Sequence, residues 1–138
     1  MHNKFVDQVD MELKRAERYS VFVSVVILDL SFLETHLEKS ELEPVKAVID
    51  KLRQSIRIMD YISPLDGYKI GLLFPETPRQ GAEIAGRRIS EIVRDHFSTK
   101  EKLPLDRVIP FQMASYPDAV GNISVGDFLK NNSINSQN

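Results

Sequence analysis

Hydrophobic and polar residues follow two distinct periods in the first part of the chain. Residues Lys4 to Arg18 place apolar side chains at helical spacing among charged ones, which predicts an amphipathic helix entering the domain. The run from Val21 to Leu30 is rich in Val and Ile on both alternating faces, which predicts a central strand covered by helices on at least one side. A second helix is predicted from Ser40 to Met59, with Ser40 and Glu43 as a capping box.

The middle of the chain has the pattern of a hairpin followed by a long helix. Short strands are predicted at Tyr61–Ser63 and Tyr68–Phe74, on either side of a turn at Pro64–Gly67. The Asp-Gly step in this turn supplies the positive φ that a tight hairpin requires. The helix predicted from Thr77 to Phe97 starts with a threonine N-cap and has Pro78 at its first helical position.

The last third of the chain is predicted to contain a strand at Val108–Tyr116, a short helix from Ser124 to Lys130 and a polar, disordered tail over residues 131–138. No internal repeat or linker divides the sequence. A chain of 138 residues, 42% of them hydrophobic and 28% charged, has the length and balance of one domain with one core. We therefore expect a single domain over residues 1–138, entered by a helix within residues 1–18.

Composition narrows the classes of function. The 18 basic and 20 acidic residues leave a net charge of −2, which provides no global field for nucleic acid or an anionic membrane. The absence of cysteine excludes disulfides and thiolate metal sites, and it suits a reducing cytoplasm. The longest apolar run, Val21 to Leu30, is about half the length of a membrane-spanning helix. The three histidines are far apart and lack metal-ligand spacing, so we expect no nucleic-acid partner, no membrane insertion and no metal.

A resemblance to a known family begins at Arg57, where the sequence reads RIMDYISPLDGYKIGLLFPET. This stretch resembles the hairpin of GGDEF domains, the bacterial diguanylate cyclases, in which an R-x-x-D pair precedes a G-G-(D/E)-E-F turn and an L-L-P-x-T-like strand end follows it. The R-x-x-D pair is Arg57 and Asp60 here. The five signature positions fall on Asp66-Gly67-Tyr68-Lys69-Ile70.

Three further segments agree with the family in order and nearly in spacing. They are an E-x-x-R-A-x-R-like segment at Glu12–Arg18, a strand ending in Leu28-Asp29-Leu30, and the segment Ala114–Ala119. The resemblance implies an α+β fold similar to class III nucleotidyl cyclases, with a central, mainly antiparallel sheet flanked by helices. It covers roughly residues 5 to 130.

The departures from the family imply that this chain is not a diguanylate cyclase. Such enzymes hold metal ions on carboxylates to neutralise the triphosphate of GTP, whereas the acidic third and fourth signature positions are Tyr68 and Lys69 here. Asp66 places a negative side chain where a glycine normally approaches the phosphates. Asp29 matches the first metal-binding aspartate, but the lysine and asparagine that follow it in the family have no match. We expect no catalytic residue, no metal and no cofactor; GTP retained as an effector near Asp29 is an alternative.

A second, regulatory site of GGDEF domains has counterparts in this sequence. In the family it binds the product, cyclic di-GMP, through the R-x-x-D pair and an arginine on the following helix, which correspond to Arg57, Asp60 and Arg88. Guanidinium groups can grip phosphate or the Hoogsteen edge of guanine, and a carboxylate can accept from guanine N–H groups. The structural alternative is that Arg57 and Asp60 form only a surface ion pair at a helix end and Arg88 belongs to a charged helix.

These observations predict a catalytically inactive, GGDEF-like signalling domain of the bacterial cytoplasm that binds cyclic di-GMP at Arg57, Asp60 and Arg88. Other signalling domains or proteins and a second copy of the chain are the expected protein partners. The alternative is an interaction or dimerisation module without a nucleotide ligand. In that case the helix at residues 4–18 receives or passes on a signal.

Overall fold

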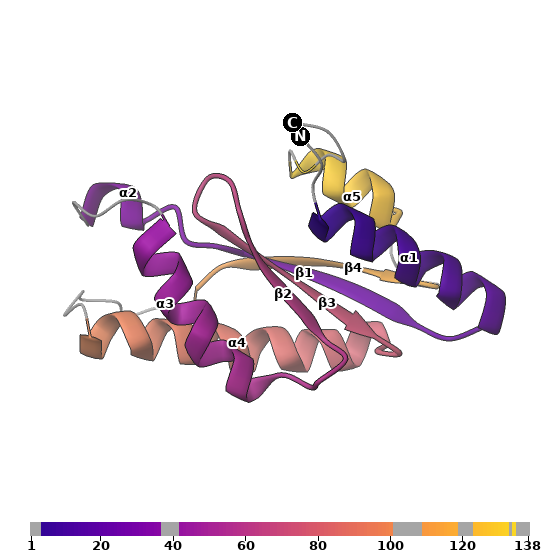
Figure 1. Ribbon diagram of the computed structural model, residues 1–138, viewed down its shortest axis with the longest axis horizontal. Coiled ribbons are helices and arrows are strands. Elements are labelled where there is room, and N and C mark those ends of the chain that lie inside the picture. The colour runs from indigo at the N-terminus through magenta and orange to yellow at the C-terminus, as the bar shows by residue number, and fades with distance from the viewer. Residues whose placement is uncertain (1–3, 37–41, 101–108, 119–122, 133, 135–138) are drawn as a thin grey trace.

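A four-stranded sheet forms the centre of the molecule, and helices cover both of its faces (Figure 1). The computed structural model describes residues 4–36, 42–100, 109–118, 123–132 and 134. In chain order the elements are α1 (Lys4–Tyr19), β1 (Val23–Asp29), α2 (Leu33–His36), α3 (Leu42–Leu52), the 3-10 turn η1 (Arg53–Ser55), β2 (Tyr61–Leu65), β3 (Lys69–Pro75), α4 (Arg79–Lys100), β4 (Phe111–Tyr116) and α5 (Val125–Asn131).

The strands run in the order β2-β3-β1-β4, and each neighbouring pair is antiparallel. The expected α+β fold with a central antiparallel sheet is therefore confirmed, and β1 is the central strand that its apolar run predicted. The register pairs Val23 with both Pro75 and Tyr116, so the start of β1 lies beside the ends of β3 and β4. At the opposite end of the sheet, Asp29 pairs with Lys69.

The two faces of the sheet bury two separate cores because alternate residues of β1 point to opposite sides. Val26 and Leu28 pack with α3 and α4 on one face. Val25 and Ile27 pack with α1 and α5 on the other face. Figure 1 shows these two layers, with α3 and α4 below the sheet and α1 and α5 above one end of it.

The second predicted helix was placed correctly in its middle but not at its end. The structure ends α3 at Leu52, adds the short turn η1 and leaves helical geometry well before Met59. Of the two apolar residues that extended the prediction beyond Leu52, Ile56 packs against the core, but Met59 is 52% exposed and does not face it. The predicted cap residue Ser40 lies outside the described residues.

The hairpin is confirmed, but its turn is shifted towards β3. Pro64 pairs with Ile70 and Leu65 with Lys69, so both belong to β2 and not to the turn. Proline is tolerated there because β2 is an edge strand. The loop consists of Asp66, Gly67 and Tyr68; Gly67 has φ +79° and Tyr68 has φ +58°, which places the positive φ in the Asp-Gly step and the residue after it.

The C-terminal elements differ from the prediction mainly at their ends. Helix α4 begins at Arg79 and continues to Lys100, beyond the predicted end at Phe97. The described part of the last strand starts at Phe111, and Val108 lies outside the described residues. The expected tail is ordered in part, because Asn131 ends α5 and Ile134 is buried in the α1–α5 core; residues 133 and 135–138 lie outside the described residues.

Candidate functional site

Arg57 and Asp60 form a compact clip in the loop between η1 and β2. The Asp60 carboxylate accepts from the backbone N–H of Arg57 at 2.8 Å, from Nε at 3.2 Å and from Nη2 at 2.9 Å. The Asp60 N–H donates back to the Arg57 carbonyl at 3.0 Å. The Asp60 side chain is only 3% exposed, whereas that of Arg57 is 47% exposed. The carboxylate therefore lies behind the guanidinium and fixes its direction.

The Arg57 guanidinium also ties this loop to the segment that joins β3 to α4. Its Nη2 donates to the Pro75 carbonyl at 2.8 Å and to Thr77 Oγ1 at 2.6 Å. Thr77 Oγ1 in turn donates to the Pro75 carbonyl at 2.9 Å. The sequence predicted Thr77 as the N-cap of the following helix, but the contacts of its hydroxyl within the described residues are with Arg57 and Pro75. Arg57 Nη1 has no hydrogen-bond partner among the described residues.

Arg88 approaches the same loop from α4. Its Nη2 donates to the Ser55 carbonyl at 2.9 Å, two residues before Arg57. Arg57 holds Thr77 just before α4 and Arg88 holds Ser55 from within it, so the loop runs along this part of the helix. The three residues singled out from the sequence thus lie around one loop, with Arg57 and Arg88 presenting exposed guanidinium groups and Asp60 buried.

The hairpin tip carries the five positions that the sequence aligned with the family signature. Tyr68 lies in the loop and packs against the α3–α4 core, and its carbonyl accepts from Leu30 N–H at 2.7 Å. Lys69 pairs with Asp29 across the strands and donates from Nζ to the Asn132 carbonyl at 3.4 Å. Asp29 and Lys69 are among the residues that line one small cavity of about 230 Å³. The described residues contain no cluster of three or more potential metal ligands.

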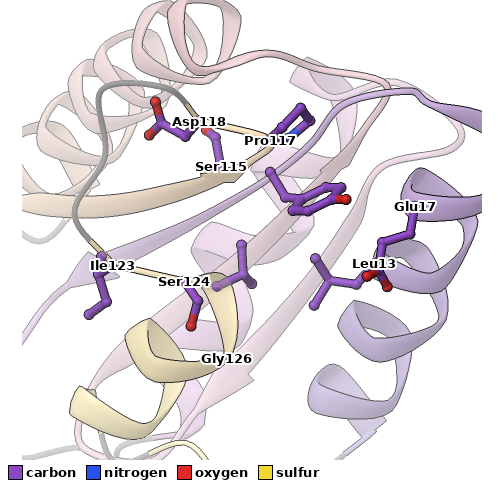
Figure 2. A pocket seen from close by; sticks show the side chains of 10 residues that line it. Leu13, Glu17, Ser115, Pro117, Asp118, Ile123, Ser124 and Gly126 are labelled. Carbon is purple, nitrogen blue, oxygen red and sulfur yellow. The ribbon is translucent and has the colours of Figure 1, made fainter.

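A second cavity of about 550 Å³ lies at the opposite end of the sheet and was not predicted from the sequence. Figure 2 shows it between Leu13 and Glu17 of α1 and the start of α5 near Ser124. Asp118 also lines it and forms an ion pair with Arg79 at 2.7 Å. No basic side chain belongs to the described lining, so this cavity suits a phosphate ligand poorly.

Two side-chain contacts near these sites connect residues that are far apart in the sequence, which is why the sequence alone did not reveal them. Arg15 and Glu76 fall in two of the segments that carry the family resemblance, yet nothing in the sequence pairs them. The structure joins Arg15 Nη2 to Glu76 Oε2 at 2.8 Å. It likewise joins the Ser24 and Ser115 hydroxyls at 2.7 Å beneath the second cavity. None of these pairs follows a short-range spacing rule.

The class of the fold is defined by its antiparallel sheet, in which the strands follow the order β2-β3-β1-β4. Two helices pack on each face of this sheet, and a hairpin forms its edge. The sequence matches no protein-family model and no curated protein sequence. Solved structures do match, and they identify the arrangement as GGDEF-like. The active GGEEF domain of a diguanylate cyclase from Vibrio cholerae is 15% identical with a TM-score of 0.58, over 85% of this chain and 75% of that one.

Two proteins of Pseudomonas aeruginosa give similar values. The GGDEF domain of YfiN (TpbB) is 14% identical with a TM-score of 0.60, over 82% of this chain and 73% of that one. PelD is 17% identical with a TM-score of 0.55, over 92% of this chain but only 42% of that one. At these identities the comparisons establish the GGDEF-like fold. No helix in the described part of the chain is long and apolar enough to cross a membrane.

Proposed function

We propose that this chain is a catalytically inactive GGDEF-like signalling domain that binds cyclic di-GMP. The proposed binding site is the loop between η1 and β2 that carries Arg57, here called the Arg57 loop. The observation that carries the proposal is the convergence of Arg57 and Arg88 on one exposed loop. Arg57 Nη1 and the donors of Arg88 other than Nη2 have no hydrogen-bond partners among the described residues. Two planar guanidinium groups with unpaired donors suit the phosphates and guanine edges of a cyclic dinucleotide.

Asp60 contributes to this site by holding Arg57. Its carboxylate is almost fully buried and already accepts from the backbone and side chain of Arg57, so in this arrangement it orients the guanidinium and does not face the solvent. A guanidinium fixed in advance loses less conformational freedom when the ligand binds. Exposed apolar side chains of Ile58, Met59 and Ile84 accompany the arginines and offer surface for the faces of the bases.

Catalytic inactivity is supported by the chemistry of the hairpin tip. Lys69 and Asp29 pair across β3 and β1 and line the same cavity, and the positive charge of the lysine opposes a metal cation there. Tyr68 packs its ring against the α3–α4 core where the family has a carboxylate. Asp66 adds a negative charge at the tip, which opposes a triphosphate.

We further propose that the domain acts in the cytoplasm and that α1 is the helix that exchanges a signal with neighbouring domains.

Isothermal titration calorimetry with cyclic di-GMP tests the proposal. We expect about micromolar binding to the wild type, lost in Arg57→Ala and weakened at least tenfold in Arg88→Ala, which corresponds to about 1.4 kcal/mol. Arg87→Ala is the matched control, because Arg87 adjoins Arg88 on α4 but pairs with Glu83 at 3.0 Å. The proposal would be contradicted if Arg87→Ala lost as much affinity as Arg88→Ala, or if the wild type produced no heat.

The alternative is an interaction or dimerisation module without a nucleotide ligand. It is favoured by the exposed apolar side chains near the Arg57 loop, of which Ile58 is 100% and Ile84 69% exposed. Exposed apolar side chains that join into one patch mark a surface that contacts another protein. A chain that produces no heat with cyclic di-GMP and yet dimerises in sedimentation experiments would support this alternative.

A further inference from the structure

The three residues Pro75, Glu76 and Thr77, here called the junction, receive contacts from α1, from the loop before β2 and from β1. From α1, Arg15 Nη2 donates to Glu76 Oε2 at 2.8 Å. From the loop before β2, Arg57 donates to the Pro75 carbonyl and to Thr77 Oγ1, as described above. The junction therefore touches both the N-terminal helix and the proposed ligand site.

Glu76 adopts a backbone conformation that favours glycine. Its φ is +51°, in the left-handed region where a side chain with a Cβ is disfavoured. The carboxylate of this residue is the group that holds Arg15, and this hydrogen bond raises the pKa of the Arg15 guanidinium. A glycine would fit the backbone but would leave α1 without its contact to the junction.

The contact of the junction with Arg15 and its contact with Arg57 depend on each other. Both acceptors of Arg57 belong to residues directly adjacent to Glu76, so a change in the Glu76 backbone moves at least one of them. The junction is also anchored on β1, because Ser24 Oγ donates to the Thr77 carbonyl at 2.7 Å. That anchor restricts the segment to local changes around Glu76 and keeps it from moving as a whole.

We propose that the junction couples α1 to the Arg57 site, with Arg15 and Glu76 as positioning residues. The ion pair between Arg15 and Glu76 holds the carbonyl of Pro75 and the hydroxyl of Thr77 where they orient Arg57. A ligand bound at Arg57 Nη1 holds the guanidinium on these acceptors and thereby changes the stability of the junction and of α1. By linkage, a partner that moves α1 alters the affinity of the site to the same extent. That this ligand is cyclic di-GMP rests on the function proposed above.

Hydrogen exchange of the ligand-free protein, measured by mass spectrometry, tests the coupling independently of any nucleotide. In Arg57→Ala we expect amides of α1 to exchange about threefold faster than in the wild type, the size of effect that one exposed ion pair supplies. Residues 90–99 of α4 serve as the internal reference, and Arg87→Ala as the control variant. Unchanged exchange in α1, or an equal increase in α1 and the reference, would overturn the proposal.

A calorimetric comparison then tests the reverse direction. Arg15→Gln should weaken cyclic di-GMP binding about threefold, again within the range of one exposed ion pair. Arg18→Gln should leave it unchanged, since Arg18 lies over the Tyr19 ring and not on the junction. A wild type that binds no cyclic di-GMP would refute the proposed ligand, and the exchange experiment would still decide whether α1 and Arg57 are coupled. Binding that Arg15→Gln leaves unaltered would refute the transmission to the ligand site.

Discussion

Asp60→Asn removes one negative charge and one acceptor oxygen from the clip that orients Arg57. The carboxylate uses both oxygens, Oδ2 for the backbone N–H of Arg57 and Oδ1 for Nη2 of its guanidinium. An asparagine can satisfy the backbone N–H with its carbonyl oxygen. Its NH2 group then faces the guanidinium, and two donors meet where a donor met an acceptor.

The cost of this substitution follows from the burial of the two partners. A hydrogen bond to a charged group contributes about 1.5–3 kcal/mol to stability. The Arg57 side chain is 47% exposed, so water compensates part of the loss on that side, whereas the 3% exposed carboxylate site admits little water. We therefore expect a loss of about 1–2 kcal/mol in the free energy of unfolding, below the roughly 3–5 kcal/mol for a broken pair in which both partners are buried.

Urea unfolding followed by circular dichroism measures this loss. With an m-value of about 2 kcal/mol/M, the midpoint should fall by about 0.5–1 M. Asp95→Asn is the matched control, because Asp95 pairs with Arg94 at 3.3 Å but is 67% exposed, and its midpoint should shift by less than about 0.25 M. Equal shifts in the two variants would refute the inference that the Asp60 carboxylate is a buried orienting group.

Two further predictions concern helix packing and the hairpin tip. Gly86→Ala should destabilise the domain by about 1 kcal/mol, because a Cβ there would lie 2.6 Å from the Phe111 ring. Gly81→Ala should be nearly neutral, because the nearest atom to its Cβ would lie 3.1 Å away and alanine favours the helix. Thermal unfolding compares the two variants, and equal effects would contradict the packing argument. The variant that carries both Tyr68→Glu and Lys69→Glu should still make no cyclic di-GMP from GTP and magnesium in a chromatographic assay. The reason is that the lysine and asparagine that follow the first aspartate in the family remain missing. Product above the blank would show that the two carboxylates alone were limiting.

The fold was predictable because its elements carry strong local signals. The apolar run of β1 and the Asp-Gly step of the hairpin each correspond to one element of the structure. A tertiary contact such as that of Gly86, whose added Cβ would lie 2.6 Å from the Phe111 ring, has no comparable local signal. Gly81 lies on the same helix with a looser surrounding, since its added Cβ would lie 3.1 Å from the nearest side chain.

The end of the second helix could not be read from periodicity. Ile56 and Met59 continue the helical spacing of apolar residues, but the chain turns after Leu52 because Arg57 finds its partners in Asp60, Pro75 and Thr77. Two of these partners lie 18 and 20 residues further on, and no short-range rule includes such contacts. Burial of Asp60 behind Arg57 is likewise a tertiary property, which the residue spacing leaves open.

The register of the sheet separates the hairpin tip from the Arg57 loop. Asp29 and Lys69 pair at one end of β1, and Val23 and Pro75 pair at the other. The seven residues of β1 separate these ends by about 20 Å at the usual rise per residue. At that distance a charge change at the hairpin tip is largely screened from Arg57. The charges at the five signature positions therefore provide no electrostatic argument against the ligand proposed for the Arg57 loop.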